Sequence, residues 1–213
     1  MARRLPVYLV VDTSGSMAGE PIEACKAGIQ MLVSGLRQDP NALETAYLSV
    51  ITFDQSARQV VPLTELPVFQ VPDLQAGGTT AMGEALGLLA QRASSEVVKS
   101  TAEIKGDWKP LVFILTDGAA TDDLMRGVQE FKKQKWGVVV ACGVAGAEVD
   151  QLKKITDTVV MLDTADSSSF KAFFAWVSAS VGVSSRSVAN TGKEVSGLDQ
   201  LPPPPPEIQI SPA

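Results

Sequence analysis

The chain has 213 residues, 45% apolar and 20% charged, a composition typical of a soluble globular domain with a full core and a short extension. Its net charge of −6 argues against nucleic acid as a partner, and no apolar run approaches the ~20 residues that span a bilayer. The absence of histidine excludes a histidine general base, a serine–histidine nucleophile pair and any histidine-bound metal.

The start of the chain and its cysteines favour a cytoplasmic protein. The first apolar stretch is broken by Pro6 and ended by Asp12, so it does not have the form of a signal peptide. Cys25 and Cys142 lie within apolar patterns, which is typical of reduced, packed thiols. We therefore expect a cytoplasmic location and no membrane partner.

Short apolar runs rich in Val, Ile and Phe alternate along the chain with segments whose apolar residues recur at helical spacing. The segment Asp39-Pro40-Asn41 indicates a break between two such elements. In chain order, we predict a strand at 5–11, a helix at 21–36, strands at 46–53 and 57–63, a helix at 82–97, a strand at 111–115, a helix at 124–131, a strand at 136–142, a helix at 148–155, a strand at 158–162 and a helix at 167–181.

This alternation predicts an α/β fold, namely a Rossmann-like three-layer sandwich. Its central sheet is expected to be mostly parallel, with helices on both faces. The strand at 57–63 pairs back as a hairpin and supplies one short antiparallel edge strand. In such sheets ligands bind at the carboxyl ends of the strands, at the point where the strand order reverses.

The composition changes beyond residue 183. Ser, Gly, Asn and Lys dominate there, and five prolines follow Leu201. We predict one domain over residues 1–183 and a flexible Ser/Gly- and Pro-rich tail over 184–213, containing a polyproline II segment. The tail is interpreted as a spacer, with a docking motif for another protein as the alternative.

Three oxygen-rich loops are the candidate functional site. Asp12, Ser14 and Ser16 follow the first strand, Thr80 follows a glycine pair at the start of a helix, and Asp117 follows the strand 111–115. Each loop alone could be ordinary turn or helix-cap chemistry. Their joint occurrence, with two loops at strand ends, indicates one metal site. Carboxylates and hydroxyls are hard oxygen ligands that suit Mg²⁺ or Mn²⁺.

With these motifs, the chain resembles the von Willebrand factor type A domain family over residues 5–181. The family's metal-ion-dependent adhesion site has the pattern Asp-x-Ser-x-Ser, then a threonine, then an aspartate. In this sequence the matching residues are Asp12, Ser14, Ser16, Thr80 and Asp117. The resemblance implies a metal-dependent protein–protein interaction module, in which a glutamate or aspartate of a partner binds the bridging Mg²⁺.

Among such proteins, the chain is similar to the bacterial TerY group of tellurium-resistance and stress-response proteins. That similarity implies a cytoplasmic adaptor linked to a protein kinase and a PP2C-type phosphatase. An alternative is an adaptor of an AAA+ ATPase, as in chelatase-like complexes. The Pro-rich tail stands where some relatives of the group carry a cysteine-rich zinc module.

An enzyme is the rival class. An aspartate at a strand end with Mg²⁺ is typical of haloacid-dehalogenase phosphatases, in which Asp12 would be the nucleophile. Those enzymes need a second acid two residues later as proton donor, and Ser14 occupies that position. We therefore expect no enzymatic activity.

Two charged clusters have simpler interpretations. Asp122 and Asp123 are placed to start a helix, although they could line the rim of the metal face. Lys132, Lys133 and Lys135 are interpreted as a solvated helix end.

Overall fold

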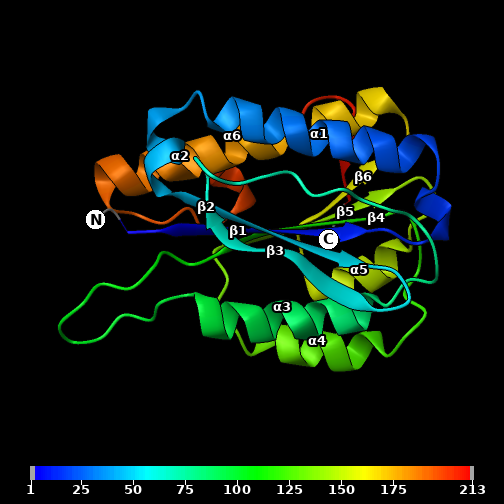
Figure 1. Ribbon diagram of the computed structural model, residues 1–213, viewed down its shortest axis with the longest axis horizontal. Coiled ribbons are helices and arrows are strands. Elements are labelled where there is room, and N and C mark those ends of the chain that lie inside the picture. The colour runs from blue at the N-terminus through cyan, green and yellow to red at the C-terminus, as the bar shows by residue number, and fades with distance from the viewer. Residues whose placement is uncertain (1–2, 212–213) are drawn as a thin grey trace.

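A computed structural model describes residues 3–211, which form a central sheet covered by helices on both faces (Figure 1). This is the predicted three-layer α/β sandwich. The strands are β1 (Leu5–Asp12), β2 (Ala46–Phe53), β3 (Ala57–Glu65), β4 (Leu111–Thr116), β5 (Val138–Val144), β6 (Val159–Leu162) and β7 (Ile208–Ile210). The helices are α1 (Glu20–Leu36), α2 (Pro40–Thr45), α3 (Met82–Glu96), α4 (Leu124–Lys132), α5 (Val149–Ile155) and α6 (Ser167–Thr191).

Within the described residues, the sheet contains seven strands in the order β3-β2-β1-β4-β5-β6-β7. β1 pairs in parallel with both β2 and β4, and β4, β5 and β6 continue in parallel. β3 is antiparallel to β2 at one edge, as predicted. The strand order reverses between β1 and β4, because the chain builds outward from β1 on one side and later returns to its other side. This is the position at which α/β sheets bind ligands.

The two faces of the sheet have separate apolar cores. Successive side chains of a strand point to opposite faces. Leu9 and Val11 of β1 therefore pack with α1 and α6, whereas Tyr8 and Val10 pack with α3, α4 and α5. The central strands are buried along their whole length, which holds their carboxyl ends in fixed positions.

The break predicted at Asp39-Pro40-Asn41 is in fact the start of the short helix α2. The Asp39 carboxylate accepts hydrogen bonds from the backbone N–H groups of Asn41 and Ala42, and Pro40 occupies the first turn. Both features favour a helix start as much as a turn. The predicted pattern was therefore compatible with either outcome, and packing against α6 and β2 stabilises the helix.

The predicted domain boundary at residue 183 is wrong, because α6 continues to Thr191. Its serine-rich second half buries Ser180, Ser184 and Ser185. Gly192 ends the helix in the left-handed conformation, with φ of 64°. Despite the length of α6, the described part of the chain contains no helix that is apolar enough over a sufficient length to cross a membrane.

The segment after α6 also differs from the predicted flexible tail, because it packs on the domain. Val195, Leu201 and Ile208 are buried, and the indole N–H of Trp176 donates to the carbonyl of Pro202 at 2.8 Å. Its last part forms β7, a second antiparallel edge strand that pairs with β6. Single apolar residues spaced among polar residues and prolines anchor this segment. Composition alone did not reveal them.

Candidate metal centre

The three predicted loops meet at one edge of the sheet, at the switch point between β1 and β4. The Asp12 loop follows β1, and the Asp117 loop follows β4. The Thr80 loop is joined to the Asp12 loop by backbone hydrogen bonds, from Gly77 to the carbonyl of Thr13 at 2.8 Å and from Gly15 to the carbonyl of Gly78 at 3.1 Å. Segments far apart in sequence therefore form one surface.

Asp12 is the last residue of β1 and is fully buried, with 0% exposure. One carboxylate oxygen, Oδ1, accepts from the backbone N–H of Ser14 at 2.8 Å, and Oδ2 accepts from Oγ1 of Thr116 at 2.5 Å. Burial raises the pKa of the Asp12 carboxyl, hydrogen bonds from Ser14 and Thr116 oppose that rise, and the charge of Asp117 adds to it.

A chain of hydroxyl contacts connects the Asp12 loop with the Asp117 loop. Oγ of Ser14 lies 3.1 Å from Oγ of Ser16, and Oγ of Ser16 donates to Oδ1 of Asp117 at 2.7 Å. A short 3₁₀ helix, Gly15–Met17, turns the loop, and the buried Met17 fixes it to the core. Ser16 is exposed, so this chain of oxygens opens to solvent.

Thr80 is positioned by its neighbours rather than by a direct hydrogen bond to the other candidate ligands. Its backbone N–H donates to Oγ1 of Thr121 at 3.0 Å, and its carbonyl accepts from the N–H of Thr121 at 2.9 Å. A methyl group built on Gly118 would lie 3.6 Å from Oγ1 of Thr80. The Thr80 hydroxyl therefore lies beside the Asp117 loop.

The conformation of Gly78 explains why the loop before Thr80 begins with a glycine pair. Its φ of 76° lies in the left-handed region, and an added Cβ would lie 3.1 Å from the backbone nitrogen of Gln55. A side chain at this position is disfavoured by both conformation and space. The glycine thus allows the loop to reach the Asp12 segment.

Two threonines of the site were not predicted as functional residues. Thr116 donates to Asp12, and Thr121 holds the Thr80 backbone. Thr116 was visible only as part of the Thr-Asp-Gly turn, with no indication of its partner. Thr121 has no sequence feature that marks it.

The donor set fits a hard divalent cation. In residues 3–211, no group of three or more His, Cys, Asp or Glu side chains is arranged to hold a metal. A cation at this edge would thus depend on the hydroxyls of Ser14, Ser16 and Thr80 as well as the two carboxylates. Oxygen-only ligands suit Mg²⁺ or Mn²⁺ better than soft metals. A charge of +2 would also relieve the repulsion between Asp12 and Asp117.

A comparison with models of protein families identifies the family of this chain. The model of the von Willebrand factor type A domain matches residues 7–175, which is most of the chain and includes all three loops. The chain belongs to the von Willebrand factor type A domain family. Type A domains commonly act as metal-dependent protein interaction modules.

Several solved structures share the fold of this type A domain. The von Willebrand factor type A protein from Catenulispora acidiphila has 22% sequence identity and a TM-score of 0.65, covering 86% of this chain and 44% of that one. Proximal thread matrix protein 1 of the mussel byssus, solved with a zinc-occupied MIDAS motif, has 18% identity and a TM-score of 0.60, covering 84% and 48%. The pilus adhesin SpaC of Lactobacillus rhamnosus GG has 15% identity and a TM-score of 0.68, covering 85% and 31%.

One curated relative is similar in sequence. The uncharacterized protein sll0103 of Synechocystis sp. is 36% identical over 123 residues, which is 54% of this chain and 26% of that protein. The chain thus spans about a quarter of this relative and less than half of the structural neighbours named above. The comparisons establish the fold and the family of the domain.

Proposed function

We propose that this type A domain is a metal-dependent protein-binding module. Asp12, Ser14, Ser16, Thr80 and Asp117 would hold one Mg²⁺ or Mn²⁺ ion, and an aspartate or glutamate of a partner would bind that ion. The observation that carries the proposal is the hydrogen-bonded chain Ser14–Ser16–Asp117 beside the buried Asp12, at the switch point of the sheet.

The charges of the site support an acidic ligand. The two carboxylates offset the two positive charges of the ion, while the remaining protein ligands are neutral hydroxyls. When bound, the ion supplies a strong electrostatic attraction for an incoming carboxylate. Without it, the same carboxylate would approach Asp12 and Asp117 on a chain of net charge −6.

Binding is also favoured over catalysis. The position two residues after Asp12, where a phosphohydrolase needs an acid, carries Ser14. Its backbone N–H is hydrogen-bonded to Asp12. The chain has no histidine that could serve as a general base. A phosphatase assay with an aryl phosphate and Mg²⁺ is expected to show no activity above that of Asp12→Asn.

The finer proposal is a cytoplasmic adaptor in a tellurium-resistance or stress-response system, with a kinase or a PP2C-type phosphatase as partner. Its support is the sequence resemblance to the TerY group. Co-purification from the native cytoplasm, followed by identification of the bound proteins, tests it. Recovery of an AAA+ ATPase instead would favour the alternative adaptor role.

Titration calorimetry with the metal alone tests the core of the proposal. We expect one Mg²⁺ or Mn²⁺ to bind per chain and Asp12→Asn to bind at least about tenfold more weakly, since a charged ligand is lost. Asp157→Asn, on the loop before β6 at the opposite edge, is the matched control and should bind normally. Partner capture should disappear in EDTA and return with Mg²⁺ or Mn²⁺. Metal binding that Asp12→Asn leaves unchanged would refute the assigned site.

A further inference from the structure

A groove runs along the outer side of α3 and α4, the two helices that lie side by side below the sheet in Figure 1. Its first part has a volume of about 530 Å³ and is lined by Gly83 and Gly87 of α3 and Gly127 of α4. A second hollow of about 360 Å³ shares Gly87 and Gln91 with the first and continues to Gln134. Together they form the α3–α4 groove, which follows the helix pair.

The floor of this groove contains one glycine that packing does not explain. A Cβ on Gly83 would lie 2.4 Å from the carbonyl oxygen of Asp123, and one on Gly127 would lie 2.1 Å from that of Gly83, so close helix contact requires both glycines. A Cβ on Gly87 would meet nothing within 4 Å. A glycine in mid-helix destabilises the helix relative to alanine. Gly87 therefore weakens α3, relieves no contact within the domain, and leaves this part of the groove without a side chain.

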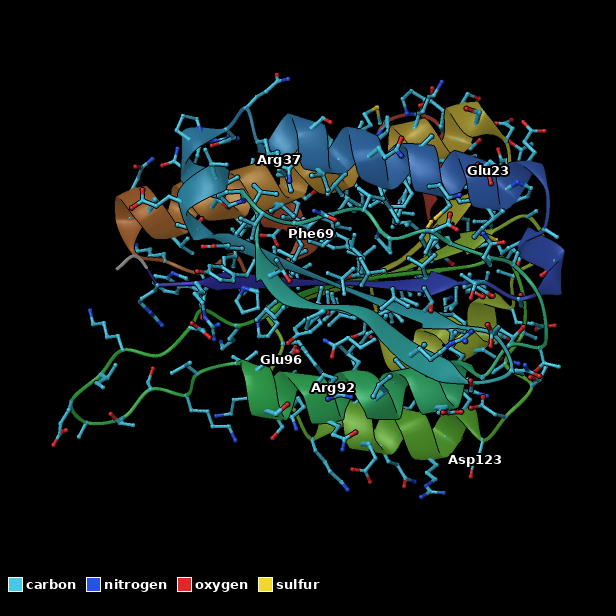
Figure 2. The ribbon with its side chains drawn as sticks, viewed as in Figure 1. Glu23, Arg37, Phe69, Arg92, Glu96 and Asp123 are labelled. Atoms are coloured by element: carbon cyan, nitrogen blue, oxygen red, sulfur yellow. The ribbon has the colours of Figure 1, made fainter. Side chains whose placement is uncertain are left out.

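The two ends of the groove carry opposite charges. The end near the metal centre is net negative, because the carboxylates of Glu84, Asp122 and Asp123 line it against one cation, Arg126. Figure 2 shows Asp123 at the start of α4. At the other end, the carboxylate of Glu130 is paired with Lys133. Gln134 there also borders a hollow of about 540 Å³ whose rim includes Lys99 and Lys135. Neither lysine has an ion-pair partner among residues 3–211. Within that range these two lysines are unpaired positive charges, on a chain whose net charge is −6.

The helix directions match this charge pattern. α3 and α4 each precede a strand that is parallel to β1, so both run from the metal edge to the opposite edge. A third helix lying antiparallel to them would have a favourable dipole arrangement. Its first turn would face the lysines and its last turn would face Glu84 and Asp123. Helices commonly carry acids in the first turn and bases in the last.

We propose that the α3–α4 groove binds an amphipathic helix of a partner protein, antiparallel to α3 and α4. That helix has carboxylates in its first turn and Lys or Arg in its last turn, with small apolar residues facing Gly87. α3 has 15 residues, so a helix of similar length, about 22 Å, spans the groove. The inference rests on the proposed function only in that both assume a protein partner, and it places a second contact beside the metal centre.

Site-specific photo-cross-linking tests the proposal. A photoreactive p-benzoylphenylalanine replaces the exposed Gln91 in the groove, and in the control it replaces the exposed Gln30 of α1, on the other face of the sheet. The full chain is irradiated in the cells that produce it naturally, and cross-linked peptides are identified by mass spectrometry. The Gln91 probe should capture a partner peptide with the stated charge order and helical apolar spacing. The Gln30 probe should not capture it.

Two substitutions of Gly87, one large and one small, form a matched pair of variants. Gly87→Leu fills the groove and should reduce the cross-linking yield at Gln91 by about tenfold, equivalent to one step of 1.4 kcal/mol. Gly87→Ala adds only a methyl group and should preserve most of the yield. Both variants should fold, because the added Cβ meets no neighbour. Equal yields in the two variants, no Gln91 cross-link, or a captured peptide from a second copy of this chain would each overturn the proposal.

Metal-binding calorimetry and the Gly87→Leu variant together separate this inference from the proposed function. If the Gln91 cross-link persists but calorimetry shows no metal binding, the groove stands and the metal-bridged role fails. If Gly87→Leu captures the partner in a metal-dependent way as well as the wild type does, the metal site stands and the groove fails.

Discussion

Asp12 and Asp117 place two carboxylates in one small site, an arrangement that destabilises the domain when no cation lies between them. The charge of Asp117 contributes to raising the pKa of Asp12, which shows that the two groups repel one another. Residues arranged for a ligand often destabilise the protein in its absence. The metal-free domain should therefore lose no stability when the charge of Asp117 is removed.

Asp117→Asn tests this conflict through two opposite effects. In EDTA we expect an unfolding free energy equal to the wild-type value or higher by up to about 1 kcal/mol, because a like-charge repulsion is lost. The amide oxygen can still accept from Ser16. In Mg²⁺ at about 100 times its dissociation constant, the wild type should gain about 2.7 kcal/mol, and the variant should lose most of that gain.

Urea unfolding in EDTA and in Mg²⁺ measures both effects, and the exposed Asp157→Asn should behave as wild type in both. An Asp117→Asn variant that loses stability in EDTA and keeps the full gain in Mg²⁺ would contradict the assignment of Asp117 to the site.

The candidate ligands were found in the sequence because their motifs combine unusual residue types at fixed spacing. Asp12, Ser14 and Ser16 stand at alternate positions after an apolar run, so the run and the motif support each other. Thr116 and Thr121 could not be found in this way. Their roles depend on which distant carboxylate or backbone group lies next to each hydroxyl, and only the folded chain shows this.

At the scale of elements, continuous apolar runs predicted the central strands well. The strand predicted at 111–115 differs from β4 by only one residue. Prediction failed where single apolar residues anchor a polar segment, as in β7, and where small polar residues are buried, as at Ser184 in α6. Hydrophobic periodicity carries no information on a buried serine or on a three-residue edge strand.

β7 offers a matched pair of isoleucines that tests whether the C-terminal segment stabilises the domain. Ile208 is 4% exposed and Ile210 is 49% exposed. Ile208→Ala should lower the unfolding free energy by about 2 kcal/mol, since it empties a buried site. Ile210→Ala should change it by no more than about 0.5 kcal/mol.

Urea unfolding and melting temperature measure the difference, and each kcal/mol corresponds to about 2–4 °C for a domain of this size. Deletion of residues 192–213 should destabilise the domain at least as much as Ile208→Ala. Small and equal effects of the two isoleucine substitutions, with no loss on deletion, would mean that this segment does not contribute to the fold.

For the whole molecule, the sheet separates two edges with different roles. The carboxyl edge presents the three oxygen-rich loops, supported by β1 and β4 that are buried on both faces. At the amino edge, Arg4 forms an ion pair with Asp107 at 2.5 Å, and the Glu96 carboxylate accepts from the hydroxyl of Tyr8 at 3.0 Å, so these three charged groups have partners within the fold. Figure 2 shows Glu96 at the end of α3 that lies away from Asp123. A ligand at the carboxyl edge should accordingly leave the amino edge unchanged.

Hydrogen exchange measured by mass spectrometry tests this separation over the whole chain. Addition of Mg²⁺ should slow amide exchange together in residues 13–18, 77–81 and 117–122, because one ion would hold three loops whose opening exposes their amides. Residues 98–107, between α3 and β4 at the amino edge, should exchange at the same rate with and without Mg²⁺. In Asp12→Asn, the same Mg²⁺ concentration should leave all three loops at their metal-free rates. Slowing confined to one loop would mean that the loops do not share an ion, and slowing at 98–107 would mean that the response spreads through the sheet.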